Sequence, residues 1–230
     1  TIVAMGTSLP ETAVSVSASI TGNNELAVSN VVGSNIFNLM VVIGVCAMIA
    51  TVNVAKETIK RDIPFSLICA GLLLILGILG VGDKSGMMLG HFDGVIFIGA
   101  FAGYIFYMIK IALKASKEGK KVEIEGGSDE DIKLISVPLS ILFIVGGAAA
   151  IAVGGDITVD AASRIASDLG MSQTLIGLTI VSIGTSLPEL VTSIVAARKN
   201  EVDMALGNAI GSNVFNILMV LGIASAIGPI

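Results

Sequence analysis

Long apolar stretches separated by short polar segments run through the whole chain. They lie near residues 35–55, 63–82, 94–113, 132–154, 172–197 and 204–228, and residues 1–20 read as the remaining part of another stretch. Apolar runs of about 20 residues match the thickness of the hydrocarbon core of a bilayer. A helix satisfies its own backbone hydrogen bonds in lipid. The pattern therefore predicts an all-α, multi-spanning membrane protein with about seven membrane helices.

Composition agrees with this prediction. The 230 residues are 54% hydrophobic and 13% charged, whereas soluble domains carry about 25% charged residues. The net charge of −5 says little about partners, because much of the acid lies in one segment, 114–131. We therefore expect a lipid bilayer as the surroundings, with no nucleic-acid or protein partner implied. Cys46 and Cys69 stand apart within apolar runs, which predicts core packing for both.

Two polar hexamers recur in these apolar regions. The sequence GTSLPE at 6–11 returns at 184–189, and GSNIFN at 33–38 returns as GSNVFN at 211–216. The offset is 178 residues in both cases. Two motifs repeated at one spacing indicate a duplicated structural unit.

The two copies are predicted to run in opposite directions across the membrane. Four spans lie between them, so the chain reverses five times from one copy to the other. Cytoplasmic loops are enriched in Lys and Arg, and this topology places 11 of the 13 basic residues on one side. These are Lys56, Lys60, Arg61, Lys110, Lys114, Lys117, Lys120, Lys121, Lys133, Arg198 and Lys199.

This topology divides the chain into three parts. We expect a first membrane repeat at 1–113, a charged cytoplasmic loop at 114–132 and a second membrane repeat at 133–230. The protein is thus predicted to be a multi-pass membrane protein, in a prokaryotic plasma membrane. Inverted repeats with broken helices at the midplane are a common plan of secondary transporters, whose ion sites lie where the copies meet.

Glu189 lies well inside its apolar span, and Glu11 is its counterpart in the first copy. A carboxylate there costs at least about 2.5–3.5 kcal/mol, so it is usually functional. Ser-Leu-Pro-Glu also matches a helix-capping box with proline in the first turn. We accept that cap geometry, but a helix that begins in mid-membrane implies a break before it, near Gly6 and Gly184. Such breaks persist where they line a cavity or are buried in protein, which favours ion binding.

Helical spacing adds further polar groups. Ser8, Glu11 and Ser15 share one face, as do Asn30, Ser34 and Asn38 on the next span. The second copy repeats both sets, as Ser186, Glu189, Ser193, Asn208, Ser212 and Asn216. Packing between membrane helices is an alternative role for such residues, and for Asn30 and Asn208 both roles stay open. For Asn38 and Asn216, one turn beyond a break expected at Gly-Ser-Asn, the ion site is favoured.

This set of groups offers oxygen ligands only. Carboxylates, amide carbonyls and hydroxyls suit hard cations, and Ca²⁺ takes six to eight oxygens. Zinc and copper prefer softer ligands, and no His or Cys accompanies the set. Two carboxylates balance one Ca²⁺, and they equally suit several Na⁺ ions or protons.

The motif pair GTSLPE and GSN[I/V]FN, present twice and inverted, resembles the α-repeats of the calcium/cation antiporter superfamily, and most closely its prokaryotic sodium/calcium exchanger homologues. The resemblance implies ten helices, five per half, of which this chain lacks the first and the last two. It implies no enzymatic cofactor. Residues 134–166 resemble the long helix that, in this family, slides past the core to alternate access to the site. The ion ligands would be Glu11, Glu189, Thr7, Ser8, Thr185, Ser186, Ser34, Asn38, Ser212 and Asn216, with carbonyls near Ala4 and Ser182.

One position departs from some family members, which carry Asp where this chain has Asn216. The amide argues against potassium dependence and leaves two carboxylates in the site. The sequence thus predicts a Ca²⁺/Na⁺ antiporter that is not an enzyme. The alternatives are H⁺/Ca²⁺ exchange at the same site, a passive cation channel, and an intramembrane hydrolase using Ser8 or Ser186. Against the hydrolase, the sequence has no G-x-S-x-G elbow around these serines, and the spans offer no histidine or buried lysine as a general base.

Overall fold

The computed structural model describes residues 2–79, 89–117 and 136–230, and every regular element in these ranges is helical. The predicted all-α class is confirmed. The first repeat and the helices after it comprise α1 (Ile2–Thr7), α2 (Leu9–Ile20), α3 (Asn24–Phe37), η1 (Asn38–Val42), α4 (Ile43–Ile49), η2 (Thr58–Asp62), α5 (Ile63–Leu79) and α6 (His91–Lys117). The rest comprises α7 (Val137–Asp168), α8 (Gln173–Ile176), η3 (Gly177–Val181), α9 (Ser182–Thr185), α10 (Leu187–Arg198), α11 (Val202–Phe215), η4 (Asn216–Val220) and α12 (Leu221–Ile227). The segments labelled η are single π-helical turns.

Several helical segments have the length and apolar composition of a membrane span. In the described ranges these are Asn24–Ile49, Thr58–Ile78, His91–Lys114 and Val202–Ile227, together with one bent pair, Gln173–Thr185 and Leu187–Arg198. The span predicted at 35–55 begins earlier, at Asn24. The helix predicted at 132–154 is the 32-residue α7, which continues to Asp168. Residues 114–117 of the predicted loop at 114–132 belong to α6, which continues to Lys117, and the rest of that segment lies outside the described residues.

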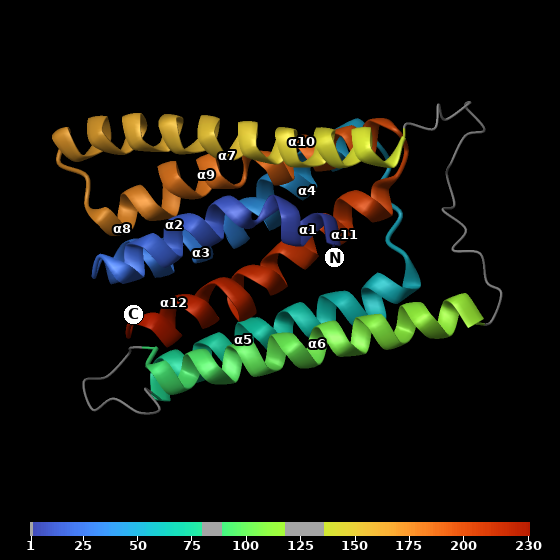
Figure 1. Cartoon of the computed structure of the whole chain (residues 1–230), viewed down its shortest axis with the longest axis horizontal. Coiled ribbons are helices and arrows are strands. Elements are labelled where there is room, and N and C mark those ends of the chain that lie inside the picture. Colours follow the sequence, from blue (N-terminus) through green and yellow to red (C-terminus); the bar gives the residue numbers. More distant parts are fainter. Residues whose placement is uncertain (1, 80–88, 118–135) are drawn as a thin grey trace.

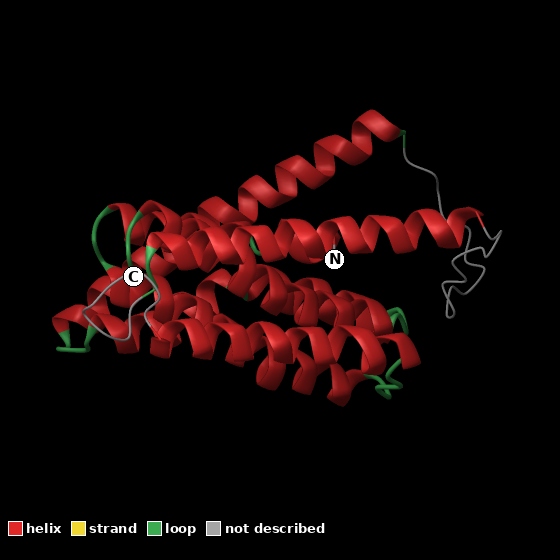
Figure 2. Cartoon of the chain, turned by 90° about the horizontal axis from the view of Figure 1, so that it is seen from below, coloured by secondary structure: helices red, strands yellow, loops and turns green. Residues whose placement is uncertain are grey.

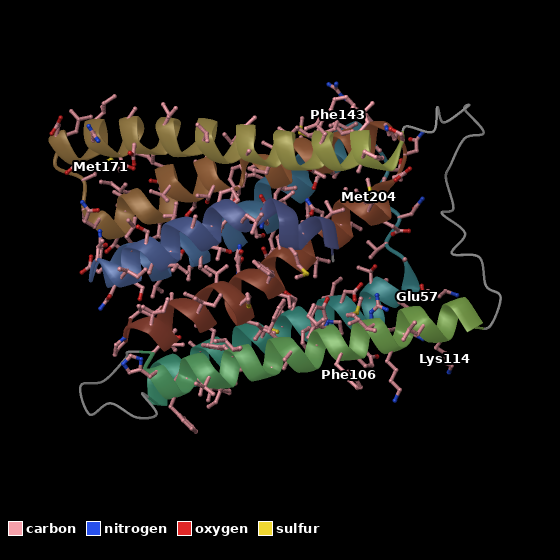
Figure 3. All side chains as sticks on the ribbon, in the orientation of Figure 1. Glu57, Phe106, Lys114, Phe143, Met171 and Met204 are labelled. Carbon is pink, nitrogen blue, oxygen red and sulfur yellow. The ribbon has the colours of Figure 1, made fainter. Side chains whose placement is uncertain are left out.

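Figure 1 shows the predicted inversion of the two copies. The α1–α2 segment runs from right to left, whereas α8–α10, its counterpart, runs from left to right. The α3–α4 segment and α11–α12 are likewise opposed. Glu57 and Lys114 lie at the right-hand end of the molecule and Met171 lies at the left-hand end (Figure 3). The right-hand end is the one that the distribution of basic residues assigns to the cytoplasm.

The outer faces of the bundle are apolar. Phe106 and Phe143 are 71% and 60% exposed and lie on opposite outer surfaces in Figure 3. Large exposed apolar side chains at many positions are unfavourable in water and suit lipid. In Figure 2, α7 crosses the bundle obliquely, and its N-terminal end lies apart from the other helices.

The interior is formed where the two copies cross. Apolar side chains of α3, α5, α6, α11, η4 and α12 contribute to the main core, in which Phe101 packs edge-on against Phe215 at 5.5 Å between ring centroids. Helix α3 crosses η3 so closely that a side chain at Gly33 would collide with the backbone of Leu178. Cys46 and Cys69 are buried and unpaired, which confirms their packing role. The polar residues of the two repeats come from α1, α2, α3 and η1 of the first copy and from α9, α10, α11 and η4 of the second.

Candidate cation-binding site

Each GTSLPE motif breaks a helix at its serine. Helix α1 ends at Thr7 and α2 begins at Leu9, while α9 ends at Thr185 and α10 begins at Leu187. Proline has no N–H for the carbonyl one turn earlier, so Pro10 and its counterpart weaken the helix at this point. The second copy bends by 43°. The predicted breaks are confirmed, about two residues after the two glycines.

The serines at these breaks contact the glutamates of the opposite repeat. The Oγ of Ser8 donates to Oε1 of Glu189 at 2.8 Å, and the Oγ of Ser186 donates to Oε1 of Glu11 at 2.8 Å. All four side chains are fully buried. The predicted position of these serines is confirmed, because each is the N-cap residue of its helix with proline in the first turn. The cap hydrogen bond that the motif also predicts is wrong, because neither hydroxyl makes one. A carboxylate is a stronger acceptor than a neutral group, and it accepts the hydrogen bond from the serine hydroxyl instead.

Further hydroxyl groups lie against the same residues. The Oγ of Ser212 donates to Oε1 of Glu189 at 3.2 Å, and the Oγ of Ser34 lies 3.3 Å from Oγ1 of Thr185. Thr7 donates to Oδ1 of Asn208 at 3.4 Å. The structure therefore brings the predicted hydroxyl residues of both repeats together around the two glutamates, and all of them are buried except the partly exposed Thr7.

Ala4 and Ser182, predicted to contribute carbonyl oxygens, are fully buried at the ends of this network. The Ala4 carbonyl accepts from the Thr7 hydroxyl at 3.3 Å, and the Ser182 carbonyl accepts from Thr185 at 3.4 Å. The Ser182 hydroxyl donates to the carbonyl oxygens of Gly177 and Asn30. Each of these two carbonyl oxygens therefore lies within hydrogen-bond distance of the threonine at the break of its own repeat.

Four buried oxygens of the predicted ligands have no hydrogen-bond donor. They are Oε2 of Glu11, Oε2 of Glu189, Oδ1 of Asn38 and Oδ1 of Asn216. Within the described ranges, the other buried polar atoms without a partner are Oδ1 of Asp93 and Oγ of Ser163. An unpaired buried acceptor costs about 1–3 kcal/mol, and more when it is charged. Four such acceptors on the two glutamates and two asparagines are an arrangement that a bound cation satisfies.

Asn30 and Asn208 differ from these ligand candidates. The amide Nδ2 of Asn30 donates to Ser15 Oγ at 3.0 Å and its Oδ1 accepts from Thr185 at 3.2 Å. Asn208 donates to Ser193 Oγ at 3.3 Å in the same way. Because both ends of each amide have partners, the geometry favours the packing role between helices over the ligand role.

The Gly-Ser-Asn segments are not breaks. Helix α3 continues through residues 33–35, and a π-helical turn follows from Asn38 to Val42. The second copy has the same turn from Asn216 to Val220. The predicted break is therefore wrong, and a π-helical turn begins at the ligand candidate instead. Such turns are frequent at functional sites.

Sequence reasoning missed two residues of this network, Asn35 and Asn213. Asn38 Nδ2 donates to Oδ1 of Asn213 at 3.0 Å, and Asn216 Nδ2 donates to Oδ1 of Asn35 at 3.2 Å. Both residues belong to the repeated hexamer, which was the available signal. They lie off the face defined by Asn30, and their partners are on the other repeat.

Inverted, broken helical repeats that meet at a buried polar site define a multi-spanning membrane transporter. The family model described as "Sodium/calcium exchanger protein" matches residues 1–110 and 139–230. The chain therefore belongs to the sodium/calcium exchanger family, as the motif resemblance indicated.

Relatives match over the full length of the chain. The chain is 40% identical over 233 residues to the putative antiporter CaxA of Alkalimonas amylolytica, covering 100% of this chain and 69% of the relative. It is 32% identical over 263 residues to the sodium/calcium exchanger MaX1 of Methanosarcina acetivorans, covering 100% and 73%. The solved sodium-calcium exchanger NCX_Mj, soaked with Na⁺ and Sr²⁺, superposes with a TM-score of 0.74 at 32% identity, covering 100% and 70%.

Proposed function

We propose that the protein exchanges Ca²⁺ for Na⁺ by alternating access to one site, built on Glu11 and Glu189. The observation that carries the proposal is the set of four buried acceptor oxygens without donors, two on the glutamates and two on Asn38 and Asn216. The serine and threonine hydroxyls at positions 7, 8, 34, 185, 186 and 212 complete the proposed ligand set.

Charge favours a divalent cation at this site. The two carboxylates are fully buried and repel each other electrostatically. Burying a charge without a partner is costly, so two adjacent carboxylates require positive charge nearby. One Ca²⁺ neutralises both, and its preferred ligands are oxygens in flexible geometry. Several Na⁺ ions sharing the same oxygens achieve the same neutrality.

Sharing of one ligand set explains the coupling of the two ions. Ca²⁺ and Na⁺ that need the same carboxylates cannot occupy them together, so each displaces the other. An empty site would carry two uncompensated charges through the apolar barrier, which opposes movement without cargo. The names of MaX1 and NCX_Mj, both sodium/calcium exchangers, support Na⁺ as the coupling ion.

Competition between the ions tests the proposal. We expect Na⁺ to displace Ca²⁺ completely from the purified protein, so that the apparent Kd for Ca²⁺ rises steadily with the Na⁺ concentration. Equilibrium Ca²⁺ binding is measured while choline replaces Na⁺ at constant ionic strength, which separates competition from screening. Ca²⁺ binding that Na⁺ leaves unchanged contradicts a shared site. Displacement of Ca²⁺ by protons and not by Na⁺ would identify H⁺ as the coupling ion.

A further inference from the structure

Asn35 and Asn213 form a reciprocal pair where α3 and α11 cross. The side-chain Nδ2 of Asn35 donates to the backbone carbonyl of Asn213 at 3.4 Å, and Nδ2 of Asn213 donates to the backbone carbonyl of Asn35 at 3.2 Å. The two residues occupy equivalent positions in the repeats. Each amide thus has its donor end fixed on a backbone acceptor of the opposite repeat.

The acceptor end of each amide, Oδ1, accepts a hydrogen bond from a proposed ligand residue of the opposite repeat. Oδ1 of Asn35 accepts from Nδ2 of Asn216 at 3.2 Å, and Oδ1 of Asn213 accepts from Nδ2 of Asn38 at 3.0 Å. A side-chain amide has one donor end and one acceptor end. Fixing the Nδ2 of Asn216 and Asn38 therefore leaves their Oδ1 atoms facing away from these partners. Those two oxygens are buried and have no donor.

We propose that Asn35 and Asn213 are positioning residues that turn the amide oxygens of Asn216 and Asn38 toward the cation. A backbone carbonyl only accepts hydrogen bonds, so it sets the direction of the amide that donates to it. That amide in turn sets the direction of the next. If Asn216 or Asn38 were reversed, its NH₂ group would face the cation and repel it.

This proposal rests on the proposed cation site and adds a directional prediction to it. The pairing is crossed, since Asn35 acts on Asn216 and Asn213 acts on Asn38. Substituting Asn35 by Ala leaves its backbone carbonyl in place, so Asn213 keeps its acceptor. The two pairs therefore form separate arms that can be tested independently. A role limited to helix packing has no such directional pattern.

A double-mutant cycle measures each arm. We expect Asn35→Ala to raise the KM for Ca²⁺ in the reconstituted protein about tenfold, equivalent to about 1.4 kcal/mol, while the maximal exchange rate changes less than threefold. The effect should disappear in an Asn216→Ala background and persist in an Asn38→Ala background. Asn213→Ala should show the reverse pattern, and it supplies a second arm if Asn35→Ala does not fold. Stabilisation by Ca²⁺, measured as a rise in Tm, should fall in parallel.

Ser19→Ala is the matched control, because it removes a buried hydrogen bond between helices, from Ser19 Oγ to the Ala224 carbonyl at 2.7 Å, away from the site. It should leave the KM for Ca²⁺ unchanged. An unchanged KM in Asn35→Ala, or the same increase in both backgrounds, overturns the positioning role. If Glu11→Gln and Glu189→Gln abolish exchange in the same assay, an unchanged KM in Asn35→Ala overturns only the positioning role and leaves the proposed cation site in place. Persistent exchange in the glutamate variants means that the proposed site itself is wrong.

Discussion

Replacing either buried glutamate by glutamine is expected to abolish Ca²⁺ exchange. Glu11→Gln and Glu189→Gln keep the size of the side chain but remove one of the two negative charges that face the cation. Removing one partner of a buried pair of opposite charges, here a carboxylate and the bound Ca²⁺, costs about 3–5 kcal/mol, which corresponds to a loss of Ca²⁺ affinity of more than roughly 100-fold. Ca²⁺ uptake by reconstituted vesicles and Ca²⁺ binding in detergent both measure this effect.

Glu25→Gln is the control for these variants. Glu25 lies in the first turn of α3, is exposed, and accepts a hydrogen bond from Thr174 at 2.7 Å. Its replacement changes the net charge by the same amount without touching the proposed site, so exchange should persist. If Glu11→Gln or Glu189→Gln retains exchange at the level of Glu25→Gln, the assignment of the site to these carboxylates is excluded.

Adding one methyl group at Gly33 is expected to destabilise the junction of the two repeats. A Cβ at this position would lie 2.5 Å from the carbonyl oxygen of Leu178 and 2.9 Å from its Cα, and would also overlap the Ser182 hydroxyl. Backbone atoms cannot rotate away, so α3 and η3 must separate. Overpacking of this kind costs about 1–3 kcal/mol. It also displaces Ser34, the next residue along the chain.

A thiol-reactive fluorogenic dye can measure this effect, because both cysteines are free and buried and become reactive on unfolding. Gly33→Ala should unfold several degrees below the unsubstituted protein and bind Ca²⁺ more weakly. Gly44→Ala is the matched control, since a Cβ at Gly44 meets no atom within 4 Å and alanine favours a helix by about 0.5–1 kcal/mol. Equal thermal stability of the two variants would show that the close crossing of α3 and η3 carries no packing constraint.

The sequence predicts the elements of this fold better than their contacts. The breaks near Gly6 and Gly184, the opposed direction of the repeats and the burial of Glu11 and Glu189 all follow from composition, spacing and topology, because each concerns one helix or the order of the helices. The π-helical turns at Asn38 and Asn216 do not follow, since a π turn has no distinct hydrophobic period.

The contacts between repeats depend on how two helices cross, and spacing along one helix carries no information on that. The serines at the breaks illustrate this limit. Local sequence gives Ser8 and Ser186 the pattern of a helix cap. In the structure, each hydroxyl instead donates a hydrogen bond to a glutamate 181 or 175 residues away. Asn35 was missed for the same reason. Its partners, Asn213 and Asn216, lie on the other repeat, and only the recurrence of the hexamer pointed to them.

Under the proposed mechanism, Ca²⁺ crosses the membrane only in exchange for Na⁺. Ca²⁺ uptake into vesicles that contain the protein tests this requirement, under an imposed sodium gradient, then a proton gradient, then neither. The proposed mechanism predicts uptake when Na⁺ is loaded inside and diluted outside, and no uptake when choline replaces Na⁺. Uptake that follows the gradient of Ca²⁺ alone, with no counter-ion gradient, would contradict exchange and identify a passive cation pathway.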